Sequence, residues 1–275
     1  MKLGVALSGG GIRGVAHAGA LKAFEENGIK IDAIGGTSSG SLVAVLYAMG
    51  YTPYYIYMLF KRYAQELVAV DTTPIINTVS SFITNKKFQI YGFNSGEAIE
   101  KAYNEIALRK GVRYMSDIKM PIVIPAVDVK TSKEYVFTNK RNKSMYISDI
   151  PVGTAVRASS SFPGVYKEFR FLDGGILDNI PVNEVKKLGA DKVIAINFKA
   201  DDIDETSNFM DISMRTLDIM GNKISEESLQ NSDFILTIQT DKTGLLDIDQ
   251  IDSCYKYGYK SALKNLSKIK SILRG

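Results

Sequence analysis

The segment Gly36-Thr37-Ser38-Ser39-Gly40 places the strongest constraint on the fold. A short apolar run, 31–35, leads into the serine, and small and apolar residues follow it over 39–49. This order predicts a strand, a strained turn and a helix, which is the context of a G-x-S-x-G nucleophile elbow. Glycines two residues either side of Ser38 let strand and helix approach without a Cβ clash. Ser38 is therefore a candidate nucleophile.

Strand and helix patterns alternate over most of the chain, which predicts an α/β fold with a mainly parallel sheet and crossover helices. We expect strands at 3–7, 31–35, 122–127, 133–137, 171–173, 192–197 and 234–238. We expect helices at 15–26, 39–49, 150–158, 181–188, 209–229 and 252–272. The strands 122–127 and 133–137 are expected to pair as a hairpin.

No repeat or low-complexity linker divides the sequence, so we expect residues 1–275 to form a single domain. Residues 51–110 are rich in tyrosine and mostly helical in pattern, and we expect a helical insertion that lies over the sheet. The aromatic side chains of 51–68 suit either an acyl channel, an interfacial surface or ordinary core. Residues 200–275 carry no motif.

Composition limits the cofactors and partners. The 275 residues include one histidine, His17, and one cysteine, Cys254, too few for a zinc site or a disulfide framework. No calcium-loop pattern is found, so we expect no metal and no cofactor. Lysine and arginine are dispersed despite a net charge of +4, so no nucleic acid is expected. Without a signal peptide or a run of ~20 apolar residues, we expect a cytoplasmic protein, with peripheral membrane contact left open.

A glycine-rich loop, residues 9–14, follows the first strand and precedes the first helix. Its residues are Gly9, Gly10, Gly11, Ile12, Arg13 and Gly14. Such a loop exposes backbone N–H groups at a helix N-terminus, which suits an oxyanion hole for acyl transfer. A nucleotide phosphate loop is the weaker interpretation, because the spacing matches neither G-x-x-x-x-G-K-[ST] nor G-x-G-x-x-G with a later acidic residue.

The general base is the open question, since serine nucleophiles usually rely on histidine. His17 lies inside the helix that leaves the glycine loop, where a packed and hydrogen-bonded role is the preferred interpretation. Asp173 is the stronger candidate, because it ends a strand and two glycines follow it. An ordinary Asp-Gly turn is the alternative.

Four segments together resemble the patatin-like phospholipase family. They are residues 9–14, 36–40, Ala158-Ser-Ser-Ser-Phe-Pro163, and Asp173-Gly-Gly followed by Asp178-Asn-Ile-Pro181. They occur in the family's order and span about residues 4–198. The resemblance implies a three-layer α/β/α fold and a Ser-Asp dyad, with Ser38 as nucleophile and Asp173 as general base. It also implies that the glycine loop is the oxyanion hole and that Arg13 is the loop's basic residue.

The resemblance further implies a lipid acyl ester as substrate, such as a phospholipid, lysophospholipid or glycerolipid. Two alternatives stay open: a general carboxylesterase or thioesterase with the same dyad, and a non-catalytic lipid-binding protein of the same fold. The segment 162–166 is expected either to shape the pocket or to form a plain turn. Ser159, Ser160 and Ser161 are expected to be helix-end residues.

Overall fold

The computed structural model describes residues 1–68, 96–140, 144–161, 170–199, 209–240, 243–244 and 247–274. Its strands are β1 (Leu3–Leu7), β2 (Ala33–Gly36), β3 (Ile122–Asp128), β4 (Lys133–Thr138), β5 (Tyr146–Ile147), β6 (Phe171–Asp173), β7 (Lys192–Phe198) and β8 (Phe234–Ile238). Its longer helices are α1 (Val15–Glu26), α2 (Ser39–Ala48), α3 (Pro53–Val68), α5 (Glu97–Leu108), α6 (Val152–Ser159), α7 (Val182–Lys187), α8 (Phe209–Gln230) and α9 (Ile251–Ile272). Short 3-10 turns occur at η1 (Gly11–Gly14), η2 (Met115–Asp117), η3 (Gly174–Ile176) and η4 (Ile248–Gln250).

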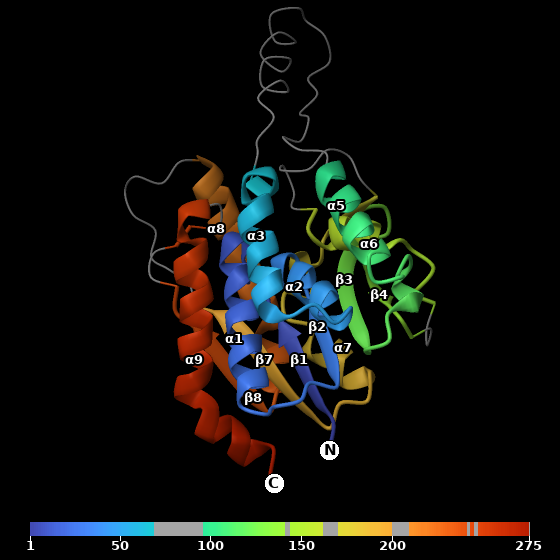
Figure 1. Ribbon diagram of the computed structural model, residues 1–275. Coiled ribbons are helices and arrows are strands. Elements are labelled where there is room, and N and C mark those ends of the chain that lie inside the picture. The colour runs from blue at the N-terminus through green and yellow to red at the C-terminus, as the bar shows by residue number, and fades with distance from the viewer. Residues whose placement is uncertain are drawn as a thin grey trace, which may run out of the picture.

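The strands form one mixed sheet in the order β5-β4-β3-β2-β1-β7-β8 (Figure 1). Its centre, from β3 through β2, β1 and β7 to β8, is parallel. The pairs β3–β4 and β3–β6 are antiparallel, and β4–β5 is again parallel. The expected mainly parallel sheet and the hairpin of β3 and β4 are therefore confirmed.

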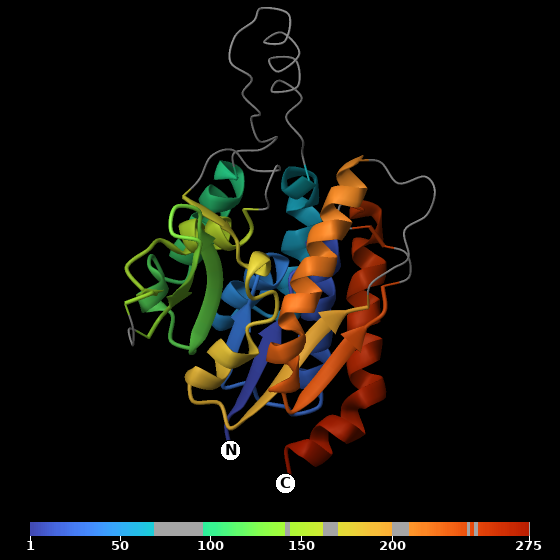
Figure 2. The same cartoon turned by 180° about the vertical axis from the view of Figure 1, so that it is seen from behind.

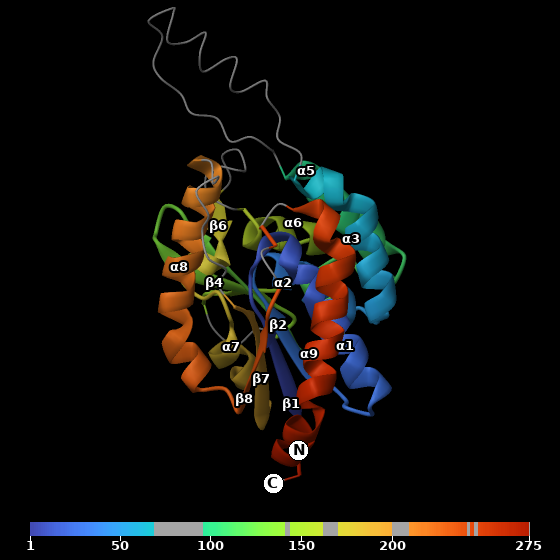
Figure 3. The same cartoon turned by 90° about the vertical axis from the view of Figure 1, so that its left-hand side faces the viewer.

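Helices cover both faces of the sheet, as the side view shows (Figure 3). One face carries α1, α2, α3 and α9, and the other carries α7 and α8 (Figures 1 and 2). Each face has its own cluster of buried apolar side chains, a large one under α1, α2 and α9 and a smaller one under α7. The predicted three-layer α/β/α architecture is confirmed.

The C-terminal part, which has no motif, completes this architecture. β8 extends the sheet beyond β7, and α9 packs along α1. At the crossing of these helices, a Cβ on Gly258 would collide with the backbone carbonyl of Ala16, so glycine allows the close approach. The predicted strand 234–238 and helices near 209–229 and 252–272 are confirmed.

Two described helices, α3 and α5, belong to the predicted insertion at 51–110. The residues between them, 69–95, lie outside the described part of the chain, so the covering role expected for the insertion stays a prediction. Tyr51 donates a hydrogen bond to the carbonyl of Ile106 at 2.8 Å and joins α3 to α5. Tyr51, Tyr55 and Tyr57 all pack against the larger apolar cluster, which is the core interpretation of these aromatic residues.

Candidate active site

The candidate nucleophile lies at the carboxyl end of the parallel strands. β1 and β2 are parallel neighbours paired at Leu7 and Gly36, so the glycine loop after β1 and Ser38 after β2 lie at the same edge. Ser38 has φ 53° and ψ −124°, an unfavourable conformation for a residue with a side chain. The chain is therefore strained at the residue predicted to react.

The glycines of the elbow are required by space. A Cβ on Gly36 would collide with the carbonyl of Gly40, and a Cβ on Gly40 would lie 2.5 Å from the Leu7 carbonyl oxygen. Gly36 thus lets β2 lie against the first turn of α2, as the sequence predicts, and Gly40 lets α2 lie against the end of β1.

Asp173 reaches Ser38 because of an unusual strand arrangement. β2 pairs with β3 at residues 122 and 123, and β4 occupies the opposite edge of β3. β6 therefore pairs with β3 on the edge that β2 has left, antiparallel, with Asp173 opposite Ala126. As a result β6 ends head-on against the end of β2, and Asp173 faces the turn that holds Ser38.

The environment of Asp173 suits a base that works near neutral pH. Burial raises the pKa of this carboxyl to about 6, while the Ser38 hydroxyl and the N–H of Gly175 favour its ionised form. Oδ1 accepts a hydrogen bond from Gly175 N–H at 2.8 Å. Within the described residues, Oδ2 accepts no hydrogen bond of normal length and angle. Loose contacts of this kind are common before substrate binds.

The glycine loop presents unpaired backbone donors beside the serine. A Cβ on Gly9 would lie 3.1 Å from the Ser38 Cβ, which places the two residues in contact. The N–H of Gly9 is taken, since it donates to both the side-chain and the main-chain oxygen of Asn179, at 3.1 and 3.2 Å. The N–H groups of Gly10 and Gly11 have no acceptor in the part of the chain that the structure describes. These two donors are therefore the candidates for an oxyanion hole.

Arg13 and His17 form hydrogen bonds with backbone carbonyls at the start of the glycine loop. Arg13 is buried, donates from Nε to the Gly10 carbonyl at 3.2 Å, and lies 5.5 Å from the ring centre of Phe198. His17 is fully buried, with Nε2 2.9 Å from the Ser8 carbonyl oxygen, and burial lowers its pKa to about 4. A neutral imidazole that donates to a carbonyl confirms the packed, hydrogen-bonded interpretation of His17.

The loop after Asp173 forms hydrogen bonds with both the serine turn and the glycine loop. The Thr37 hydroxyl donates to the main-chain oxygen of Asp178 at 2.8 Å, and Asn179 holds Gly9. Burial, with added repulsion from Glu134 and Glu184, raises the pKa of the Asp178 carboxyl to about 8. The sequence motif contains Asp178 and Asn179, but nothing in it assigns them these contacts.

An apolar pocket lies between α3 and α5. Its walls are Leu59, Phe60, Tyr63, Ala98, Ile99, Ala102, Tyr103 and Ile106. Tyr103 donates to the carbonyl of Leu42, and the N–H of Leu42 donates to the carbonyl of Ser38, at 3.2 and 3.3 Å. Residues of the 51–68 segment therefore line an apolar pocket, and the Tyr103 hydrogen bond links its wall to α2, the helix that follows the candidate nucleophile. Residues 162–166, the other expected pocket segment, lie outside the described residues.

No group of three histidine, cysteine, aspartate or glutamate side chains in the described ranges is arranged to hold a metal ion. Among the helices described, none combines the length and the apolar character needed to cross a membrane.

Sequence comparison identifies the family. A profile of the family described as patatin-like phospholipase matches residues 5–186. The chain belongs to the patatin-like phospholipase family. The resemblance stated from four short segments is thus confirmed over most of the chain.

Curated relatives include lysophospholipase NTE1 of Scheffersomyces stipitis, with 30% identity over 96% of this chain and 18% of that protein. Lysophospholipase NTE1 of Candida albicans is also 30% identical, over 94% of this chain and 20% of that protein. This chain therefore spans a fifth or less of the length of these relatives. The uncharacterized protein YqhO of Bacillus subtilis is 31% identical over 64% of each chain.

Solved structures share the fold. VipD of Legionella pneumophila gives a TM-score of 0.53 at 14% identity, covering 97% of this chain and 67% of that one. ExoU from its complex with SpcU of Pseudomonas aeruginosa gives 0.53 at 18% identity, covering 98% and 51%.

Proposed function

We propose that this protein is a serine hydrolase of lipid acyl esters that works through a Ser38–Asp173 dyad and an acyl-serine intermediate. The observation that carries the proposal is the head-on meeting of β2 and β6, which sets a buried carboxyl with a pKa of about 6 against the hydroxyl of a strained serine. The family, and the lysophospholipase name of the fungal relatives, support a lipid ester as substrate.

In this mechanism the Asp173 carboxylate accepts the Ser38 proton as Oγ attacks the ester carbonyl carbon. The N–H groups of Gly10 and Gly11 stabilise the oxyanion, and one such donor is commonly worth about 10²–10³ in rate. The intermediate collapses, the C–O bond to the leaving alcohol breaks, and Asp173 returns the proton to that oxygen. Water then attacks the acyl-serine with Asp173 again as base, which releases the fatty acid and free Ser38.

Asp178 is the rival base, since its carboxyl is also buried and part of it lacks a hydrogen-bond partner among the described residues. Asp173 is preferred because the Ser38 hydroxyl interacts with it. Asp178 acts through its main-chain oxygen, which Asp178→Asn leaves in place. We expect Asp173→Asn to abolish ester hydrolysis and Asp178→Asn to retain most of it. The reverse result would assign the base to Asp178.

The reaction itself is tested by mass spectrometry of products from a mixed lipid extract, with wild type against Ser38→Ala. Free fatty acid formed by wild type alone supports the proposal. Nitrophenyl esters of graded chain length, beside intact phospholipids, separate a lipid hydrolase from a general carboxylesterase or thioesterase. A folded protein that a fluorophosphonate probe does not label at Ser38 would instead be a lipid-binding protein of the same fold.

We also propose that residues 1–275 act as one domain, which the packing of β8 and α9 on the motif-bearing part supports. The cytoplasmic location and the peripheral membrane contact stay predictions from the sequence.

A further inference from the structure

Helix α6 and the two serines after it contact both members of the proposed dyad. The backbone N–H of Ser38 donates to the Oγ of Ser159 at 3.2 Å. The N–H of Asp173 donates to the main-chain oxygen of Ser161 at 2.9 Å. One short segment, 159–161, thus sits between two residues that are far apart in the sequence.

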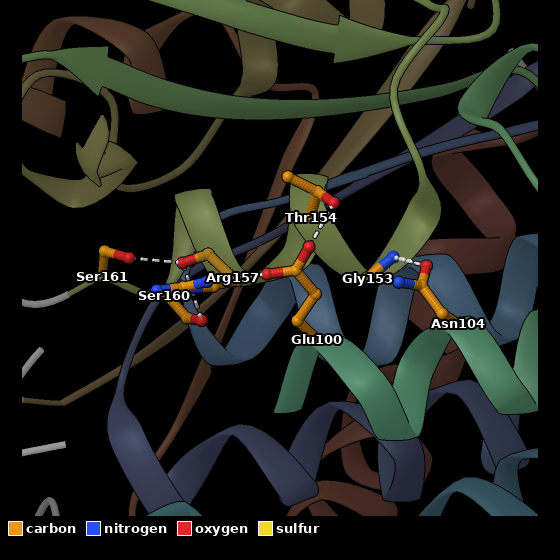
Figure 4. Close-up of polar contacts among 7 residues, drawn as sticks. All are labelled: Glu100, Asn104, Gly153, Thr154, Arg157, Ser160 and Ser161. Carbon is orange, nitrogen blue, oxygen red and sulfur yellow. Dashed lines mark hydrogen bonds and ion pairs between the residues drawn. The ribbon is translucent and has the colours of Figure 1, made fainter. Parts of the chain in front are cut away.

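Helix α6, which leads into this segment, is held in turn by α5, as the close-up shows (Figure 4). Glu100 forms an ion pair with Arg157 at 2.8 Å and accepts a hydrogen bond from the Thr154 hydroxyl at 2.5 Å. Asn104 accepts from the N–H of Gly153 at 2.8 Å. These contacts join two turns of α6 to α5 and so hold α6 in place.

The three serines of the segment differ in what their hydroxyls do. Ser160 and Ser161 donate to carbonyls of their own helix, those of Val156 and Arg157, which is the usual behaviour of serine near a helix end. Ser159 is fully buried and accepts from the backbone of the strained residue instead. Its oxygen is the one described acceptor of the Ser38 N–H.

We propose that Ser159 is a positioning residue, which holds the backbone of Ser38 in its φ 53° conformation and so keeps the Ser38 hydroxyl against Asp173. A buried N–H without an acceptor is unfavourable, so loss of the Ser159 oxygen favours a relaxed turn in which that N–H finds another partner. The relaxed turn carries the hydroxyl away from the carboxyl. This inference rests on the proposed function, because it presupposes that the dyad reacts.

The test compares Ser159→Ala with Ser160→Ala, a matched control that removes a buried hydroxyl from the adjacent residue. Fluorophosphonate labelling of Ser38 and ester hydrolysis are measured for both and for wild type. We expect Ser159→Ala to lower kcat and the labelling rate by about ten- to a hundredfold with KM unchanged. Ser160→Ala is expected to stay within about threefold of wild type. Ser159→Thr, which keeps the oxygen, is expected to recover most of the loss.

A second readout separates positioning from general loosening of the fold. The Ser38 hydroxyl lowers the pKa of Asp173, so a displaced hydroxyl raises the pH at which labelling falls on the acid side. We expect this shift in Ser159→Ala and no shift in Ser160→Ala. Equal losses in both variants, or wild-type labelling by Ser159→Ala, would overturn the positioning role while the proposed function stands. Absence of labelling in wild type would overturn both.

Discussion

The pH dependence of the reaction distinguishes an aspartate base from a histidine base in this chain. Burial raises the pKa of Asp173 to about 6, and in the proposed mechanism only its ionised form accepts the serine proton. For one such group, kcat/KM at pH 5 is about a tenth of its plateau and at pH 7 about nine-tenths. An aspartate at its ordinary pKa of about 3.9 would be more than about nine-tenths ionised at pH 5.

His17 does not account for such an acid limb, because its pKa of about 4 keeps the imidazole neutral above pH 5. His17→Gln retains a side-chain N–H for the Ser8 carbonyl, so the loop keeps its support. The assay is kcat/KM for a soluble nitrophenyl ester from pH 4.5 to 8.5, with circular dichroism at each pH to confirm folding. We expect wild type and His17→Gln to share a one-proton limb near pH 6. A folded His17→Gln variant that is inactive, or whose limb disappears, would refute the dyad mechanism.

Three further predictions concern stability and chain length. Asp173→Asn removes a buried carboxylate whose pKa is raised by about two units, so it should raise the free energy of unfolding by up to about 3 kcal/mol at pH 7. Because the pKa of Asp173 is higher in the folded state than in the unfolded state, wild-type stability declines as pH rises from about 4 to 6. The stability gained by Asp173→Asn, measured by denaturant unfolding, should therefore vanish near pH 4. A gain that persists at pH 4 would show that the buried carboxylate is not its cause. Ser38→Gly should be about 1 kcal/mol more stable than Ser38→Ala, since glycine tolerates a φ of 53°. Equal urea unfolding midpoints for the two variants would show that the backbone at residue 38 is not strained. Ala102→Phe narrows the pocket between α3 and α5, so it should lower kcat/KM for long-chain esters at least fivefold and leave kcat/KM for acetate esters unchanged. Glu105→Phe, on the exposed side of α5, is the control. An unchanged chain-length profile in Ala102→Phe would exclude the pocket from acyl binding.

The sequence predicts the parts of the site that depend on neighbouring residues. Strand, turn and helix follow from the local pattern around Ser38, and the parallel pairing of β1 and β2 follows from the alternation of elements. The clash that a Cβ would cause at Gly36 confirms the predicted close approach of strand and helix, whereas Gly40 is required by the end of β1. The mainly parallel sheet, the hairpin of β3 and β4 and the three layers also agree with the prediction.

The contacts that bring the parts together were not predictable from local patterns. Nothing near Asp173 indicates that β6 pairs with β3 on the edge vacated by β2. The bonds from Ser38 to Ser159 and from Gly9 to Asn179 join residues 121 and 170 positions apart. Ser159 and Ser160 are adjacent serines and only Ser160 bonds within its own helix, so residue type cannot tell them apart. The strand β5 was missed because two residues are too few to show a periodic pattern.

The packing of the C-terminal part limits where the chain could be shortened. The family profile ends at residue 186, inside α7, and a shortened protein ending there would hold every proposed catalytic residue. It would also lack β7, leaving β1 as an open sheet edge, and it would lack α9, which covers the small-residue side of α1. An open central strand and a bare apolar helix favour aggregation. The family profile and the folded unit therefore end at different residues, and we expect a minimal stable fragment to extend through α9.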